Sequence, residues 1–232
     1  DEFSREHFKE EYPSGTRFVT KKEVEAGTYP QLKEGVYKEY ANREPRFYAW
    51  IAFHNGYYEV SGEDDRKEFS YAPVWKRGKD KKYKQLVQFM KTQNMGITND
   101  NKYGTKTGYL NKKGAHPGTS ASKSTGFKVI NYPWPMVRLA ELYLNYAEAC
   151  VECNDLPEAK RYLNYVRGRA GIPTVEESWD GIAELTQNKL REIVRQERLI
   201  ELYMENHNFW DIRRWGIAET LGEQPKGLSV QA

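Results

Sequence analysis

The sequence predicts a mainly α-helical protein, in which a scaffold of tetratricopeptide-like helices carries long loops and a small β-hairpin. Three observations predict this class. After residue 133, apolar residues recur at spacings of three and four, the period of amphipathic helices. Two of the expected helices have the spacing of small and large residues of a tetratricopeptide unit, which is about 34 residues long. Before residue 133, aromatic residues, turn residues and charged runs alternate without that period. We therefore expect a loop-rich, ligand-facing region over residues 1–132 and a helical region over residues 133–232, both within one fragment of a larger single domain.

The composition is that of a folded, soluble chain. Its 232 residues are 38% hydrophobic, which is enough for a core, and the net charge of +3 is too small to indicate a nucleic-acid binder. No run approaches the roughly 20 apolar residues that span a bilayer, and the first residues lack the pattern of a signal peptide. Because the chain also lacks an initiator Met, we expect a mature fragment of a longer protein whose targeting segment is missing.

The first expected helix begins near Pro135 and has a polar and an apolar face. The polar face comprises Arg138, Glu141, Asn145, Glu148 and Glu152. The apolar stripe comprises Met136, Leu139, Ala140, Tyr143, Tyr146, Ala147 and Cys150. A stripe of this width predicts that a second helix covers it.

That second helix is expected from Asp155, where Asp155 and Glu158 form a capping-box pattern and Pro157 falls in the first turn. Gly171 and Pro173 are typical of its end. Its apolar positions are Leu156, Ala159, Leu163, Val166 and Ala170.

A third helix is expected from about Thr186 to Glu205, with Leu190, Ile193, Val194, Ile200 and Met204 as its apolar positions. Glu197 and Glu201 interrupt that stripe one turn apart. An acid/base or di-iron pair is one interpretation, but the Glu-x-x-His spacing of di-iron helices is absent. We favour buried ion pairs, with arginines nearby in the sequence as partners: Arg195, Arg198, Arg213 and Arg214.

A fourth helix is expected from about Asn208, and its aromatic residues read as core: Phe209, Trp210 and Trp215, together with Ile212. The lone His207 is interpreted as a hydrogen-bonding group at a helix end rather than as a ligand or base. Cys150 and Cys153 lie at the end of a helix without a second ligand pair, so we interpret them as structural and expect no metal.

The region before residue 130 has strand and loop patterns. Phe47 to Phe53 alternate as in a strand, and Asn55-Gly56 predicts a tight turn into Tyr57 and Tyr58, hence a short hairpin. The basic run from Lys76 to Lys84 suits phosphate, lipid headgroups or single-stranded nucleic acid as ligands, but we favour a solvated loop because the charge is local. Glu63 to Asp65 lack the spacing of a calcium loop, and residues 92–128 read as long surface loops.

Sequence motifs of catalysis are absent: there is no G-x-S-x-G, H-E-x-x-H, Walker A or G-x-G-x-x-G sequence. We therefore expect no enzymatic activity, no catalytic residues and no cofactor. The paired carboxylates of a glycoside hydrolase can come from distant segments, so that class stays open as an alternative.

Five stretches in order along the chain resemble the SusD/RagB family. From the N-terminus, they are REPRFYA from Arg43, TGYLNKK from Thr107, RLAELYLNYAEA from Arg138, NYVRGRAGIP from Asn164 and ERLIELYMENHNFWDIRRWG from Glu197. In the first of them, Glu44 stands where the family usually has Asp. The block from Glu197 to Gly216 is the most specific. The resemblance implies a surface-exposed lipoprotein of the outer membrane, built on tetratricopeptide-like helices. Such a protein takes part in polysaccharide utilization: it captures oligosaccharides for a SusC-like TonB-dependent transporter without catalysis. The lipid anchor would lie outside this fragment.

The candidate ligand-binding residues follow from the chemistry of sugars. A sugar ring has an apolar C–H face and a belt of hydroxyls, so a binding platform needs exposed aromatic rings with charged or amide groups at its rim. The candidates are Trp75, Trp50, Tyr57, Tyr58, Tyr71 and Arg77. Trp75 comes first, and its alternative role is to anchor a loop by packing.

Two other functions remain open. In a tetratricopeptide-type adaptor, the same rings would anchor a protein partner. In a glycoside hydrolase or lyase, the protein would cleave a polysaccharide.

Overall fold

The computed structural model describes residues 17–30, 32–61, 74–77, 82–89, 105, 107–116, 120–122, 126–128, 130–131, 133–179 and 185–222. The strands at 57–61, 74–77, 82–86, 120–122 and 126–128 are described through their backbone. The chain divides into two compact units: residues 1–132 with 226–232, and residues 133–225.

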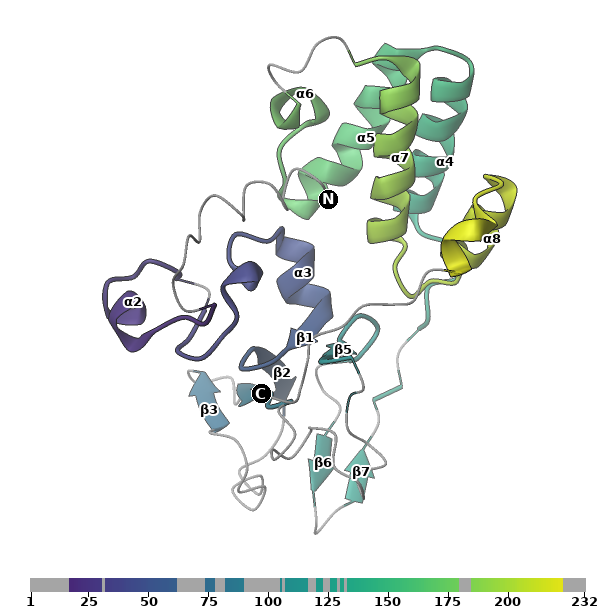
Figure 1. Ribbon diagram of the computed structural model, residues 1–232. Helices are drawn as coiled ribbons and strands as arrows, with labels where there is room; N and C mark the ends of the chain where they lie inside the picture. The colour runs from purple at the N-terminus through teal and green to yellow at the C-terminus, as the bar shows by residue number, and fades with distance from the viewer. Residues whose placement is uncertain are drawn as a thin grey trace. The chain divides into compact units, whose positions relative to one another are not determined.

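The second unit is helical. Helix α4 contacts both α5 and α7, and the three lie side by side in Figure 1. The elements of this unit are α4 (Leu139–Glu152), α5 (Leu156–Ala170), α6 (Val175–Ser178), α7 (Gln187–Glu201), α8 (His207–Arg214) and the 3-10 helix η4 (Ala218–Gly222).

The core of the helical unit lies among α4, α5 and α7. On α4, Ala140 and Ala147 are buried as predicted, but Leu139 is 59% exposed and Tyr146 is 47% exposed. Leu144 and Val151, which the predicted stripe did not include, are fully buried. The predicted apolar face was wrong in these positions. Two helices, α5 and α7, cover α4, so the buried side of α4 differs from the side that a single partner helix would cover.

Helix α5 follows its sequence signals closely. Asp155 Oδ1 accepts a hydrogen bond from the Glu158 N–H at 3.4 Å, and Gly171 ends the helix with φ +71°. Ala159 and Leu163 have no exposed surface and Val166 has 2%, as the apolar spacing predicted.

The third helix is shorter than predicted. Helix α7 ends at Glu201 rather than Glu205, and Met204 and Asn206 both have positive φ, of 60° and 66°. These two residues turn the chain into α8, whose aromatic residues were predicted to be core. Phe209 is 48% exposed and Trp210 is 64% exposed, so that prediction was wrong for both. A helix of eight residues contacting one side of α7 buries only a narrow stripe, which here is Asp211 and Ile212.

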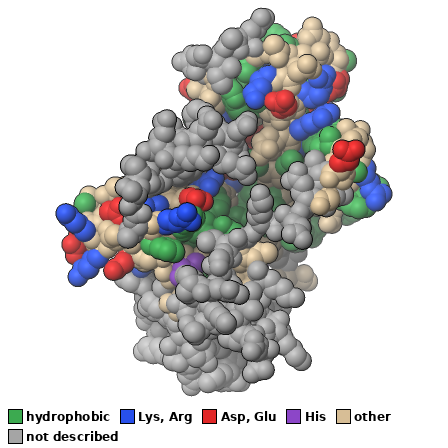
Figure 2. All heavy atoms as spheres, in the orientation of Figure 1, with side chains coloured by type: hydrophobic (Ala, Val, Ile, Leu, Met, Phe, Trp, Pro, Cys, Tyr) green, Lys and Arg blue, Asp and Glu red, His purple; other side chains and the backbone are tan. Residues whose placement is uncertain are grey.

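The first unit begins with short helices around an aromatic core. These elements are α2 (Lys21–Glu25), the 3-10 helix η1 (Lys38–Tyr40), α3 (Pro45–Trp50) and β1 (Ile51–Phe53). On α2, positive and negative side chains lie side by side, as Figure 2 shows at its left. Glu23 caps the helix with Thr20 and also accepts a hydrogen bond from Lys38 Nζ at 2.6 Å, which lowers the pKa of the Glu23 carboxyl to about 2. The core comprises Val19, Leu32, Val36, Tyr40, Ala41 and Phe53.

The strand predicted over Phe47 to Phe53 was wrong in its first part. Residues 45–50 form α3, because Pro45 occupies the first turn, where its fixed φ favours a helix. Only Ile51–Phe53 extend as β1. Asn55, with φ 57°, and Gly56 do form a turn, in which the Gly56 N–H donates to the Phe53 carbonyl at 2.9 Å.

The strands on either side of that turn do not pair with each other, so the predicted hairpin was misplaced. Strand β1 pairs with β5, and β2 pairs with β4. Among the described strands, the sequence-adjacent antiparallel pairs are instead β3–β4 and β6–β7. Residues 92–128, predicted as loops, include the three short strands β5, β6 and β7. Strand β5 pairs with β1, and β6 pairs with β7. The strands are β2 (Tyr57–Ser61), β3 (Val74–Arg77), β4 (Lys82–Leu86), β5 (Tyr109–Asn111), β6 (Ser120–Ser122) and β7 (Gly126–Lys128).

Candidate functional site

Three of the candidate ligand-binding residues share one face of the sheet β2–β4–β3. Central strand β4 pairs antiparallel with both neighbours, and Lys84 is opposite Glu59 on one side and Trp75 on the other. Residues opposite one another, and residues two apart along a strand, lie on the same face. Tyr57, Trp75 and Arg77 therefore share a face, which we call the Trp75 face.

The register separates the other candidates from that face. Tyr58 is opposite Gln85 and lies on the other side of the sheet, because it is one residue away from Tyr57. Tyr71 lies outside the described residues. Trp50 is the last residue of α3 and belongs to a different part of the unit.

Trp50 is half-buried, and cations of the chain itself lie against its ring. Lys113 Nζ is 4.1 Å from the ring centroid and Arg46 Cζ is 5.9 Å from it. Arg46 is buried and makes two hydrogen bonds to the Glu44 carboxylate, at 3.0 and 2.9 Å. A cation over an indole ring is a favourable contact, so at least part of this ring already has an intramolecular partner.

Strand pairing brings the stretch from Arg43 to Ala49 next to the stretch from Thr107 to Lys113. Ile51 is opposite Asn111, and the Lys112 N–H donates to the Trp50 carbonyl at 2.7 Å. The Lys112 ammonium donates to the Tyr48 carbonyl. Sequence reasoning missed Lys112 and Lys113 because Lys112 is 64 residues away from Tyr48, and no local pattern reports contacts across that distance. It missed Arg46 because a strand was predicted where α3 places Arg46 one turn before Trp50.

The basic run, predicted as a solvated loop, lies partly in strands. Lys76 and Arg77 end β3, and Lys82 and Lys84 lie in β4. The loop interpretation was wrong for these four residues, because β3 and β4 pair with each other. Glu63 to Asp65, considered for calcium, lie outside the described residues.

In the helical unit, Glu197 and Glu201 are buried in ion pairs, as predicted. The predicted partners were wrong. Arg167 Nη1 lies 3.1 Å from Glu197, while Arg138 and Arg169 each place an Nη1 atom 3.0 Å from Glu201. The arginines next to the glutamates in sequence contact other groups: Arg198 pairs with Asp211 and Arg214 with Glu148, while Arg195 and Arg213 lie over the rings of Trp215 and Phe209.

Those neighbouring arginines hold α8 against the other helices. Arg198 pairs with Asp211 at 3.0 Å, and Arg214 makes hydrogen bonds to both Glu148 and Asp211. The Trp215 indole N–H donates to Glu148 at 2.7 Å. The block from Glu197 to Gly216 thus serves mainly to connect α4, α7 and α8.

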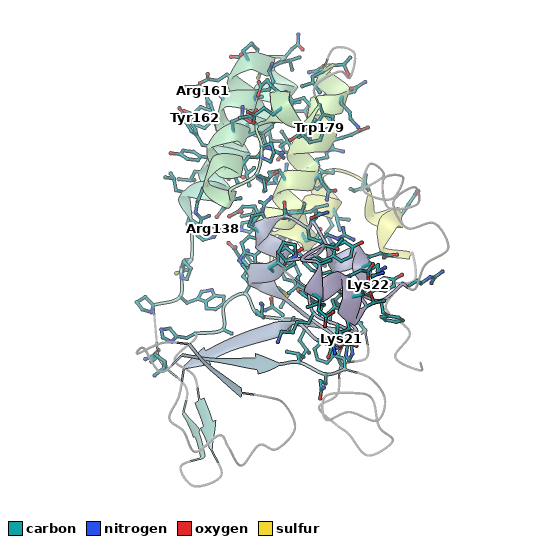
Figure 3. All side chains as sticks on the ribbon, turned by 90° about the vertical axis from the view of Figure 1, so that its left-hand side faces the viewer. Lys21, Lys22, Arg138, Arg161, Tyr162 and Trp179 are labelled. Atoms are coloured by element: carbon teal, nitrogen blue, oxygen red, sulfur yellow. The ribbon has the colours of Figure 1, made fainter. Side chains whose placement is uncertain are left out.

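A second surface with aromatic residues covers the outer side of α4 and α5. Four rings lie there, with centroid separations between 4.5 and 5.5 Å: Tyr143, Tyr146, Tyr162 and Tyr165. Arg161 lies over the Tyr162 ring at 4.9 Å, and the two side chains can be followed in Figure 3. Leu139 and Leu142 extend this tyrosine face along α4, and they are 59% and 52% exposed.

His54 and His207 contact groups of the protein itself. His54 Nδ1 accepts a hydrogen bond from the Phe89 N–H at 3.0 Å, and burial lowers the pKa of His54. His207, the first residue of α8, places Nε2 3.6 Å from Glu141. Cys150 and Cys153 are free thiols. Among the described residues, no group of three or more His, Cys, Asp or Glu side chains is arranged to hold a metal ion.

Comparison with known proteins identifies the family. The sequence model of the SusD family matches residues 9–229. The chain belongs to the SusD family. Proteins of this family are in general non-catalytic glycan-binding proteins, typically associated with the outer membrane at the cell surface. Within the described residues, no helix has both the length and the apolar composition needed to cross a membrane.

Individual SusD-family proteins match over parts of their length. SusD-like protein P25 of Formosa agariphila is 41% identical over 80 residues, covering 34% of this chain and 15% of that protein. The solved selenomethionine structure of BT4246 has a TM-score of 0.63 and 29% identity, covering 89% of this chain and 32% of that one. The SusD-like protein BF3747 of Bacteroides fragilis has a TM-score of 0.51 and 31% identity, covering 78% and 29%. The mainly helical, SusD-like fold is therefore confirmed, and the chain spans about a third of the solved structures it matches.

Proposed function

We propose that this SusD-family protein binds oligosaccharides at the cell surface and delivers them to a SusC-like TonB-dependent transporter of the outer membrane. The observation that carries the proposal is the Trp75 face, where register brings an indole, a phenol ring and a guanidinium onto one side of a sheet. Rings of this kind cover the apolar face of a sugar, while cations and hydroxyls meet its oxygens. Family membership supports the choice of a glycan over other ligands.

The candidate residues have different expected roles in this proposal. Trp75, Tyr57 and Arg77 form the platform. Trp50 lies against Lys113 and Arg46, so we assign it a supporting role in which it fixes the junction of α3 and β5. Tyr58 lies on the opposite face of the sheet, and for it we propose packing rather than ligand contact.

Delivery to the transporter requires a protein held at the outer membrane. We propose that a lipid anchor in the longer protein supplies this attachment, and that the protein captures ligand without cleaving it. The helical unit would act as the rigid support, since ion pairs join α4, α5, α7 and α8.

Affinity electrophoresis against plant, fungal and host glycans tests the binding proposal. The protein is expected to be retarded by at least one glycan, and Trp75→Ala is expected to reduce the affinity at least tenfold, about 1.4 kcal/mol. Trp210→Ala removes a tryptophan that is 64% exposed on α8 and serves as the matched control, with unchanged affinity. Retardation by none of the glycans, or equal losses in both variants, argues against the proposal. Release of reducing ends from a bound glycan argues for a hydrolase instead.

A second candidate function is a tetratricopeptide-type adaptor that binds a protein partner. The tyrosine face favours it, because exposed tyrosines beside exposed leucines are typical of protein interfaces. Tyr146→Ser and Tyr165→Ser would then abolish capture of a partner in a pull-down, whereas Trp75→Ala would not. If the captured partner is a TonB-dependent transporter, the tyrosine face is the transporter contact of the first proposal. If only a non-transporter protein is captured, the adaptor function is favoured.

A further inference from the structure

The Trp75 face carries three cations and one carboxylate, beside Tyr57 and Leu86, whereas the opposite face of the same sheet carries one cation. Across the three strands, Glu59, Lys84 and Trp75 form one row, and Ser61, Lys82 and Arg77 form the next. The opposite face carries Lys76 as its only charged residue among the described strand positions, beside mostly apolar or aromatic ones. Those neighbours are Tyr58, Val60, Val74, Tyr83 and Gln85. Strand alternation thus places three of the four described cations of the basic run on the face that carries Trp75: Arg77, Lys82 and Lys84.

Polarity sorted in this way is the pattern of an antiparallel sheet with one packed and one solvated face. The face with Val60, Val74 and Tyr83 has the composition of the packed one. The register places Trp75 on the other face, in one row with Lys84 and Glu59. This placement favours the binding role of Trp75 over the packing role.

The arrangement of charge indicates which glycans fit. Neighbouring strands are about 4.8 Å apart and residues two apart along a strand are about 6.8 Å apart, so Lys82, Lys84 and Arg77 lie within one short patch beside Trp75. A neutral sugar needs hydroxyl-binding groups and gains little from several cations. Carboxylate and sulfate groups are the natural partners of such cations, and Arg binds them through two parallel hydrogen bonds.

Resting on the glycan-binding function proposed above, we infer that the ligand is an anionic oligosaccharide, whose rings carry carboxylate or sulfate groups that Lys82, Lys84 and Arg77 recognise. Trp75 contacts the apolar face of a ring, and the cations select its charge. Glu59 lies in the same row as Lys84 and Trp75, and its carboxylate suits a sugar hydroxyl that donates a hydrogen bond to it. That carboxylate disfavours a single-stranded nucleic acid, whose phosphates follow one another without interruption.

The test compares the 232-residue chain with charged and neutral glycans by calorimetry and affinity electrophoresis. Polygalacturonate and alginate probe carboxylates, carrageenan probes sulfates, and dextran and xylan are neutral references. At least one anionic glycan is expected to bind at least tenfold more tightly than every neutral one. Raising NaCl from 0.05 to 0.5 M is expected to weaken that binding, because screening shortens the reach of exposed charges.

Two lysine variants with opposite expectations keep the inference falsifiable. Lys84→Gln is expected to weaken binding of the anionic glycan by roughly fivefold, and to weaken it more than binding of any neutral glycan. Lys76→Gln removes the same charge from the neighbouring strand but from the opposite face, and is expected to have no effect. Thermal melting of both variants checks that the fold is retained.

The following outcomes contradict the inference that the ligand is anionic. Equal affinity for charged and neutral glycans, or equal effects of the two lysine variants, overturns the inference and leaves glycan binding intact. Failure to bind any glycan overturns both. Tighter binding of a single-stranded oligonucleotide than of any anionic glycan assigns the face to nucleic acid and overturns the inference.

Discussion

At the scale of single residues, Gly56 shows how one side chain limits a turn. A Cβ atom built on Gly56 would lie 2.9 Å from the ring of Phe53, which is only 5% exposed. We expect Gly56→Ala to reduce the free energy of unfolding by about 1–3 kcal/mol, because the ring has to move within a packed core. Denaturant unfolding measures the change.

Gly168 is the matched control for that substitution. It lies in helix α5, where an added Cβ would meet no atom within 4 Å. Gly168→Ala is expected to raise the free energy of unfolding by about 0.5–1 kcal/mol, because alanine loses less backbone entropy in a helix. If Gly56→Ala is as harmless as Gly168→Ala, the close approach of Phe53 to the turn is contradicted.

His54 gives the protein a pH-dependent term in its stability. Burial holds the pKa of folded His54 below its ordinary value of 6.5, and its Nδ1 atom accepts the Phe89 N–H. The unfolded chain therefore takes up the proton first as the pH falls. The stabilising contribution of neutral His54 is complete above about pH 6.5 and is lost as the pH falls through the lowered pKa.

His54→Asn tests this assignment, since the Asn Oδ1 atom replaces the acceptor without titrating. Between pH 8 and pH 5 the melting temperature of the wild type is expected to fall more than that of the variant. Differential scanning calorimetry across this range measures both. Parallel curves for the two proteins would show that His54 is not the group responsible.

At the scale of elements, buried charges join helices that the sequence leaves unconnected. The Glu148 carboxylate on α4 accepts hydrogen bonds from Arg214 and from the Trp215 indole, and lies 3.5 Å from Arg198 Nε. Glu148→Ala is expected to reduce the free energy of unfolding by about 3 kcal/mol, because it removes a carboxylate beside the buried Arg198 guanidinium and leaves the half-buried Trp215 N–H without its acceptor.

Glu152, one turn further along α4, is the control for Glu148. It pairs with Arg191 at 2.7 Å, but its side chain is 48% exposed. Glu152→Ala is expected to change the free energy of unfolding by less than about 1 kcal/mol, since water replaces the lost partner. Denaturant unfolding distinguishes the two variants, and equal losses would contradict the difference in burial on which the comparison rests.

At the scale of the whole molecule, the described core residues form separate clusters. The cluster of α4, α5 and α7 lies entirely within residues 133–225, and the two clusters of the first unit lie entirely before residue 132. We therefore propose that the helical region is an independently folding part of the protein. Chains shorter than about 70–80 residues usually cannot be stabilised by a single hydrophobic core, and this region of about 90 residues is longer than that.

Expression of residues 133–225 alone tests that proposal. The fragment is expected to have a helical circular dichroism spectrum and a cooperative thermal transition, because its core and its buried ion pairs are complete within it. The whole chain melted under the same conditions is the reference. A fragment that is unfolded or melts without cooperativity would show that the helical region depends on the rest of the chain.

The local signals of the sequence determined the helices and, through them, the family. The cap at Asp155 and the stop at Gly171 bound α5, and the apolar spacing located α7, because both depend on residues within one or two turns of each other. The same short-range information supported the SusD assignment, since its recognisable blocks lie mainly in these helices.

Apart from the packing of α5 on α4, tertiary structure alone decided which elements meet. The ion pair of Glu148 with Arg214 joins residues 66 positions apart, and the register of β2 with β4 sorts Trp75 and Lys84 onto one face. Local patterns do not contain these pairings, because hydrogen bonds and ion pairs depend on distance in space rather than on separation along the chain. The sequence by itself thus determined the helical scaffold and its family, and the tertiary structure decided which of the candidate residues belong to one surface.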